Sequence, residues 1–207
     1  LSRIPEPDET DAQSDGGALD LARFTRMTRL GVDERAEALV TFPARLTTIA
    51  EDFLGFSRNV GMVDLSTLVH LRRIPARFLR GCSALTRVAF PESVEAFDSC
   101  ALVDCSRLPA LDLSNLDRVT KLPWRFAEGC TSLQRVRLPP NLAEIDKWVF
   151  LSCEALTDLN LSEATSLHTI GVRLLDKDVG RRGSRMQAIR LPASVTALDS
   201  TFAGNFR

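Results

Sequence analysis

A short apolar pattern that returns at nearly constant spacing constrains this chain more than any other feature of its sequence. The pattern is an apolar residue, any residue, a second apolar residue and then a proline or a small residue. It occurs eight times between Leu19 and Pro192, and the steps from the start of one copy to the next are 21, 23, 25, 23, 25, 23 and 30. Self-similarity at this period predicts a solenoid, in which each repeat forms one coil and neighbouring coils share a core.

The copies come in pairs. Those that end in Pro alternate with those that end in Ser or Ala, and the final pair is stretched by five residues. The second apolar residue of each kind recurs at one constant interval, as Phe42, Phe90 and Leu138 in one register and Leu65, Leu113 and Leu161 in the other. Two interleaved registers of this regularity indicate that the structural unit is a pair of repeats in the alternating 23/25-residue pattern.

Each copy of the pattern has the alternation of a β-strand, because its two apolar residues would point to the same side. A single repeat is too small to bury that side, whereas coils stacked about 4.8 Å apart would pair their strands in a parallel sheet and share one interior. Between the strands, Phe78 and Cys82 recur as Phe126 and Cys130. We therefore expect an α/β solenoid with one parallel strand per repeat and short helical or turn return segments, in which a one-turn helical piece carries a Phe into the core.

The run from Phe126 to Pro139 (FAEGCTSLQRVRLP), followed by Leu142 and Ile145, resembles the BspA-like class of leucine-rich repeats. The resemblance extends over most of the array, although Leu54 and Leu102 stand in place of the Phe in their repeats. It implies a leucine-rich-repeat solenoid with a strand-lined face, adhesion or protein binding, and no catalysis. Many members of the class are surface proteins of bacteria or protists, so the resemblance also implies a cell-surface location as an alternative.

The two ends and one insertion depart from the repeat. Residues 1–17 contain five acidic residues, one Arg and two Pro, and we expect a flexible acidic leader because the segment has little apolar surface to bury. Residues 18–207 are then an array of about eight repeats. The longest repeat contains a basic insertion at residues 177–185 with Arg181 and Arg182, which predicts a loop on the outside of the solenoid where a partner could bind.

Composition limits the function classes. Lys and Arg total 26 and Asp and Glu total 27, a formal net charge of -1, which argues against a dedicated nucleic-acid binder while leaving a local basic patch open. No apolar stretch reaches the roughly 18 residues needed to span a bilayer. The five cysteines are an odd number and lack the clustering of a disulfide scaffold, so they favour a reducing, intracellular compartment.

No group of residues in the sequence suggests catalysis. His70 and His168 fall at positions expected on the surface, four strands apart, and cannot share a metal. A set of cysteines occupies equivalent positions in four successive repeats, namely Cys82, Cys105, Cys130 and Cys153. Such a ladder does not converge on one point as zinc ligands must, so we expect small buried apolar fillers. We expect no catalytic residue, no metal, no cofactor and no small-molecule substrate.

The outward residues of the predicted strands form columns across the array. The central column is acidic toward the N-terminus and basic toward the C-terminus, and such a charge pattern could orient a protein partner. The residues expected to bind that partner are Asp64, Arg87, Asp112, Arg135, Arg137, Asn160 and Arg190 on the strands and Arg181 and Arg182 in the insertion. The sequence therefore predicts a non-catalytic protein-interaction scaffold with a strand-lined concave face. A cell-surface adhesin and a structural subunit of a larger assembly are the alternatives.

Overall fold

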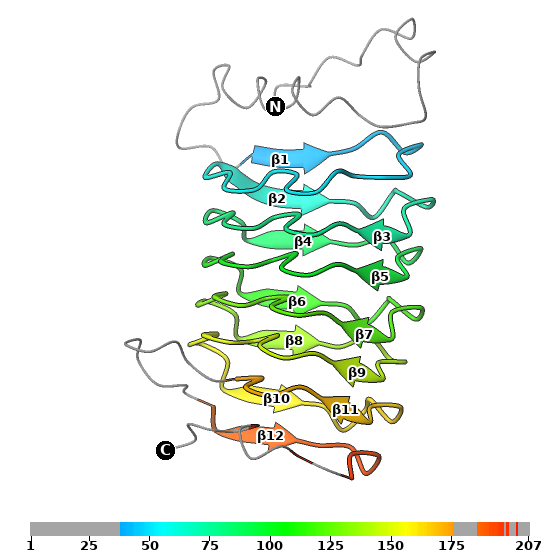
Figure 1. Ribbon diagram of the computed structural model, residues 1–207. Helices are drawn as coiled ribbons and strands as arrows, with labels where there is room; N and C mark the ends of the chain where they lie inside the picture. Colours follow the sequence, from blue (N-terminus) through cyan, green and yellow to red (C-terminus); the bar gives the residue numbers. More distant parts are fainter. Residues whose placement is uncertain (1–37, 176–185, 197, 199–201, 203–207) are drawn as a thin grey trace, which may run out of the picture.

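The computed structural model describes residues 38–175, 186–196, 198 and 202, and in them the chain forms a stack of coils with parallel strands along two sides (Figure 1). The first set of strands occupies the positions that the apolar pattern predicts. It consists of β1 (Ala38–Thr41), β2 (Val60–Asp64), β4 (Arg87–Ala89), β6 (Ala110–Asp112), β8 (Arg135–Arg137), β10 (Asp158–Asn160) and β12 (Ala188–Arg190). The predicted acidic leader and the earliest copy of the pattern lie outside the described residues.

Equivalent residues of successive coils lie opposite one another in this first set. β2 pairs with β4 in parallel through Met62 and Arg87, and β6 pairs with β8 through Ala110 and Arg135. The strands remain in contact throughout, but the hydrogen-bonded ladder is interrupted between β4 and β6 and between β8 and β10. The interruptions therefore recur once per pair of coils. The expected parallel-strand solenoid is confirmed.

The central residue of each strand points into the core, as the alternation predicts. Leu111 and Leu159 are buried, whereas Val88 and Val136 are partly buried and pack against the same apolar cluster. This continuous interior removes apolar surface from water along the whole described stack, which is the dominant source of stability in a solenoid.

The prediction of one strand per repeat is wrong. A second set of two-residue strands follows the first around the coil, and it consists of β3 (Arg73–Ile74), β5 (Ala96–Phe97), β7 (Lys121–Leu122), β9 (Glu144–Ile145) and β11 (Thr169–Ile170). These strands pair in parallel in two ladders, one with β9 between β7 and β11 and one that joins β3 to β5, which we together call the second sheet. The second residue of each strand faces the core and the first faces outward, so this second sheet closes another side of the coil.

The prediction of a one-turn helical piece is also wrong, because the return segments of the described coils are turns. Their backbone N–H groups donate to the next coil rather than four residues back along the chain: the amides of Leu79 and Leu102 donate to the carbonyls of Ala101 and Phe126 at 2.8 and 2.9 Å. Most of these corners also have two residues with a positive φ, as at Arg77 with 58° and Gly81 with 72°. These left-handed residues interrupt the helical conformation, and the turns satisfy the same backbone groups between coils.

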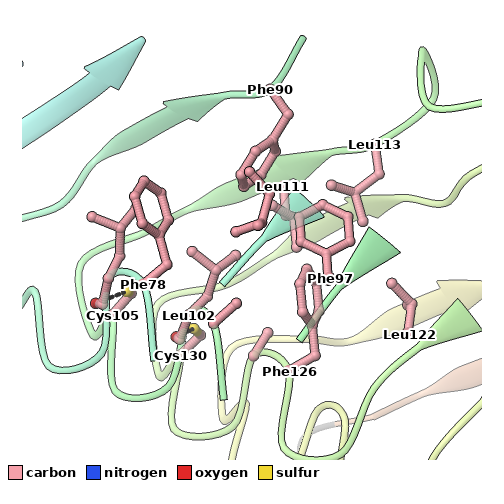
Figure 2. Packing of buried hydrophobic residues seen from close by; sticks show 14 of the residues in the cluster. Phe78, Phe90, Phe97, Leu102, Cys105, Leu111, Leu113, Leu122, Phe126 and Cys130 are labelled. Carbon is pink, nitrogen blue, oxygen red and sulfur yellow. Dashed lines mark hydrogen bonds between the residues drawn. The ribbon is translucent and has the colours of Figure 1, made fainter. Parts of the chain in front are cut away.

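Aromatic rings fill the interior between the two sheets (Figure 2). Phe126 is fully buried, and its ring centroid lies 4.8 Å from that of Phe97, which in turn lies 5.0 Å from Phe90. Phe53 stacks on Phe78 at 6.0 Å. Among the described residues, Phe53 is the first Phe of a return segment that packs in this interior. It lies one residue before Leu54, which the resemblance placed at the position of the Phe.

The four regularly spaced cysteines are buried, as predicted, and each also makes a contact that the sequence did not suggest. Each thiol lies within hydrogen-bond distance of a carbonyl oxygen of the preceding coil, from Cys82, Cys105, Cys130 and Cys153 to Leu54, Leu79, Leu102 and Ala127 at 3.0 to 3.3 Å. Burial raises the pKa of the Cys82 thiol to about 12. The thiol therefore stays protonated and serves as a small filler that also donates a weak hydrogen bond between coils.

Candidate protein-binding face

The outward residues of the first set of strands, from β1 to β12, form what we call the strand face. Seven of the nine residues predicted to bind a partner lie on it: Asp64, Arg87, Asp112, Arg135, Arg137, Asn160 and Arg190. Asp64 is half-buried and the other six are exposed. The remaining two, Arg181 and Arg182, lie outside the described residues.

Side chains on every second coil of this face are held by the turn that follows their strand. The Oδ1 atom of Asp112 accepts from the backbone N–H of Ser114 at 3.1 Å and from its hydroxyl at 2.6 Å. The same arrangement recurs one pair of coils later, where Asn160 accepts from Ser162 at 3.1 and 2.7 Å. These contacts fix the orientation of the strand-face oxygens. The sequence signal for these contacts is an Asp or Asn followed two residues later by Ser, repeated once in each pair of coils.

Two ion pairs join neighbouring coils across the face. Arg190 places Nη1 at 2.8 Å from both carboxylate oxygens of Asp158, and Arg137 places Nη1 at 3.5 Å from Oδ2 of Asp112. All four side chains are about half exposed or more, so each pair contributes only about 0.2–1 kcal/mol to stability. The predicted division into an acidic and a basic half is correspondingly weaker than expected, because Asp158 lies within the basic half and both pairs neutralise charge locally.

Two arginines of the face differ from the others. Arg87 and Arg135 are exposed, and neither forms an ion pair with any residue in the part of the chain that the structure describes. Arg87 is close enough to contribute to the lowered pKa of Asp64, whose largest cause is hydrogen bonding by Ser66. These two guanidinium groups are therefore the cations of the strand face most available to a partner.

The second sheet differs from the strand face because every charged residue of its strands is paired with the neighbouring coil. Arg73 contacts Asp98 at 2.7 Å, and Lys121 contacts Glu144 at 3.0 Å. At the adjoining corner, Arg77 contacts Glu51 at 2.8 Å. An ion-paired surface offers a partner less uncompensated charge than the strand face does.

A cluster at the corner after β7 and β9 was not found from the sequence. Arg125 lies against the rings of Trp124 and Trp148, at 5.2 and 5.9 Å from their centroids, and places Nη2 at 2.6 Å from Oε1 of the buried Glu128. Both indole nitrogens are enclosed and have no hydrogen-bond partner among the described residues. Because the arginine charge is neutralised and the indole donors are covered, we interpret this cluster as packing between coils.

The contacts of Ser114 make a testable prediction about the strand face. Hydrogen bonding by Ser114 is the largest cause of the lowered pKa of Asp112, with a smaller contribution from Arg137. We expect Ser114→Ala to raise the pKa of Asp112 toward its ordinary value of 3.8. These bonds favour the charged carboxylate in the folded protein. Their contribution to stability is therefore present above pH 3.8 and is lost as the pH falls through the lowered pKa of Asp112 in the folded protein. A side-chain ¹³C NMR titration measures the shift. Ser162→Ala, beside an uncharged Asn, is the control and should leave the titration of Asp112 unchanged.

The comparisons with known proteins agree with this architecture. The family described as the BspA type leucine-rich repeat region matches residues 47–178 in six copies, more than half of the chain. This chain belongs to the BspA-type leucine-rich repeat family. A leucine-rich repeat protein from Bacteroides ovatus, known from a crystal structure, is 17% identical with a TM-score of 0.63, and the match covers 77% of this chain and 38% of that protein. A leucine-rich repeat protein of T. pallidum is 20% identical with a TM-score of 0.45, over 75% of this chain and 59% of that one. No curated protein matches the sequence.

Within this BspA-type array the described side chains show no constellation suited to metal chemistry. In the described coils, no group of three or more His, Cys, Asp or Glu is placed to hold a metal ion. His70 and His168 are exposed, as predicted, and Cys100 is half-buried near the surface. No helix among the described residues has the length and apolar character that crossing a bilayer requires. The strand face is therefore the most developed candidate site of this BspA-type repeat.

Proposed function

We propose that this chain is a non-catalytic protein-interaction scaffold that holds its partner on the strand face. The observation that carries the proposal is the difference between the two sheets: the second sheet pairs its charges between coils, whereas the strand face keeps Arg87 and Arg135 without ion pairs among the described residues. Repeat proteins commonly bind through extended surfaces of this kind, because exposed strand residues can vary while the core remains the same.

Arg181 and Arg182, in the basic insertion, are proposed as a second contact with the partner. The mixed charge of the face favours a protein over a nucleic acid, because a polyanion would meet Asp64 and Asp112 as well as the arginines. For location, the buried thiols favour a reducing compartment, and the family resemblance favours a cell surface. An adhesin would use the same face as an intracellular scaffold, so the proposal concerns the surface rather than the compartment.

Reversing three charges of the strand face tests the proposal. We expect the combined variant Arg135→Glu, Arg137→Glu and Arg190→Glu to abolish capture of a protein partner from the native source. The expected cause is that three attractive contacts become repulsive and that Asp112 and Asp158 lose the arginines that pair with them. Quantitative mass spectrometry of proteins cross-linked to wild type and variant measures the loss, and circular dichroism verifies that the variant is folded.

The matched control carries the same change of net charge on the second sheet, as Arg73→Glu, Arg118→Glu and Lys121→Glu. We expect this control to retain the partner. Equal loss in both variants would show that binding depends only on net charge, and full retention by the strand-face variant would show that the partner binds elsewhere.

A further inference from the structure

Two arginines on alternate coils can share one carboxylate from the coil between them, and the second sheet shows this arrangement. Glu95 places Oε1 at 3.6 Å from Nη1 of Arg72 and at 2.9 Å from Nη1 of Arg118. The three residues belong to successive coils and form a three-member ladder with the acid in the middle, although Arg118 lies two residues before Thr120, the position equivalent to Arg72 and Glu95. All three side chains are about half exposed. The ladder therefore forms on the surface, without help from burial.

The strand face has a comparable arrangement without the acid, and its three residues occupy equivalent positions in their coils. Arg87 on β4 and Arg135 on β8 occupy the outer rungs, and Ala110 on β6 occupies the middle one. Ala110 pairs directly with Arg135 in the register. Its equivalent in the preceding repeat is Arg87 on β4, a strand that stays in contact with β6 although no hydrogen-bonded ladder joins the two. At a coil spacing of roughly 4.8 Å the two arginine backbones are separated by about twice that distance. An extended arginine can cross half of this gap, so both guanidinium groups can reach a point above Ala110.

We propose that Arg87 and Arg135 together bind one carboxylate of a partner protein, an Asp or Glu side chain seated above Ala110. This inference rests on the proposed function and names the chemistry of its contact. Ala110 is half-buried and lacks a side chain that would block the approach. Two guanidinium groups converging on a carboxylate make charge-assisted hydrogen bonds, which are among the strongest that a surface can offer.

The surroundings of this socket, formed by Arg87, Ala110 and Arg135, select a protein acid over a polyanion. Asp112 lies on the same strand as Ala110, and its pKa is lowered chiefly by Ser114, so it remains charged at neutral pH. Asp64 lies on the far side of Arg87, and its pKa is lowered by Ser66. A single carboxylate fits between these acids, whereas neighbouring phosphates of a nucleic acid would be repelled by them.

Substituting Ala110, which lies between the two arginines, tests the socket. We expect Ala110→Glu to supply the missing carboxylate from the chain itself and to block the partner, whereas Ala110→Gln adds the same bulk without charge. The probe is an acetylated and amidated peptide of four Glu-Ser repeats, titrated into the full chain while the ¹⁵Nε resonances of the arginines are followed by NMR. In the wild type the signals of Arg87 and Arg135 should move together and give one Kd. Arg118, which already has its carboxylate, should not respond.

The expected effect is a rise in Kd of about tenfold or more for Ala110→Glu and a change within about twofold for Ala110→Gln, because only the first occupies both guanidinium groups. The same peptide with Gln in place of Glu should not shift either arginine. The inference is overturned if Arg87 and Arg135 do not respond to the acidic peptide, or if Ala110→Glu and Ala110→Gln bind it equally well.

The outcome is separable from that of the proposed function. If the strand-face triple variant loses partner capture but Arg87 and Arg135 do not respond to the peptide, the strand face remains the proposed binding surface and the shared carboxylate is rejected. Full capture by the triple variant would reject the strand face itself, whatever the peptide does.

Discussion

Phe126→Ala is expected to lower the free energy of unfolding by about 3–5 kcal/mol. The side chain is fully buried, and its ring packs edge-on against Phe97 of the preceding coil (Figure 2). Removing it leaves a cavity between coils that are tied together by backbone hydrogen bonds such as the one from Leu102 to the carbonyl of residue 126, at 2.9 Å. The coils therefore cannot close the space without breaking that ladder. Equilibrium unfolding in urea measures the change.

Phe56→Ala is the matched control. Phe56 is also an aromatic residue of a return segment, but it is 63% exposed; its ring lies against Gly81, and the Arg80 guanidinium lies 5.4 Å from the ring centroid. We expect a loss of less than about 1 kcal/mol, the range for an exposed cation–π contact. A similar loss for both variants would show that the interior between the two sheets is not the source of stability.

Gly171→Ala is expected to destabilise the last described coils by about 3 kcal/mol, the upper part of the range for overpacked sites. A Cβ atom at this position would lie 2.3 Å from the backbone nitrogen of Lys147 and 2.4 Å from the carbonyl carbon of Asp146. These are backbone atoms of the preceding coil, so rotation of a side chain cannot relieve the contact. The amide of Gly171 also donates to the carbonyl of Ile145 at 2.7 Å. Moving the coil away would break that bond and loosen β11 from β9.

Hydrogen exchange resolved by residue measures this effect, because a solenoid can lose its terminal coils before its centre. Protection should fall in β11 and remain in β4 and β6. Gly55→Ala is the control: its Cβ would meet one carbonyl oxygen, of Asp52, at 3.0 Å and other atoms only at 3.7 Å or more. We expect less than about 1 kcal/mol for that variant. Unchanged protection in β11 of the Gly171 variant would contradict the tight approach of the two coils.

These two substitutions and the strand-face variants address separate parts of the coil. Phe126 and Gly171 maintain the distance between coils, whereas Arg87, Ala110 and Arg135 contribute little to it because they are exposed or small. A solenoid can therefore change its partner by replacing strand-face residues while its packing stays constant. For this reason we expect the charge-reversed variants to remain folded.

The sequence alone predicted the positions of the first set of strands in the described coils and the residues that line the strand face. Both follow from a local alternation that returns in every coil, so Leu111 and Asp112 point to opposite sides whatever else the chain does. It also predicted the buried cysteines, because Cys82, Cys105 and Cys130 recur at the positions of a core residue. The assignment of the outward residues to partner binding stays a prediction.

Other features depended on tertiary contacts. A second strand of two residues, such as Lys121 and Leu122, is too short to display alternation and exists only because neighbouring coils offer it backbone partners. The return segments are turns for the same reason, since their amides bond to the next coil. Whether an arginine is paired depends on which acids the adjacent coil places within its reach. Arg190 lies opposite Asn160 and reaches Asp158 two residues away, whereas Arg135 lies opposite Ala110. Local sequence sets which side of the chain a residue faces, and the stacking of coils decides what that residue contacts.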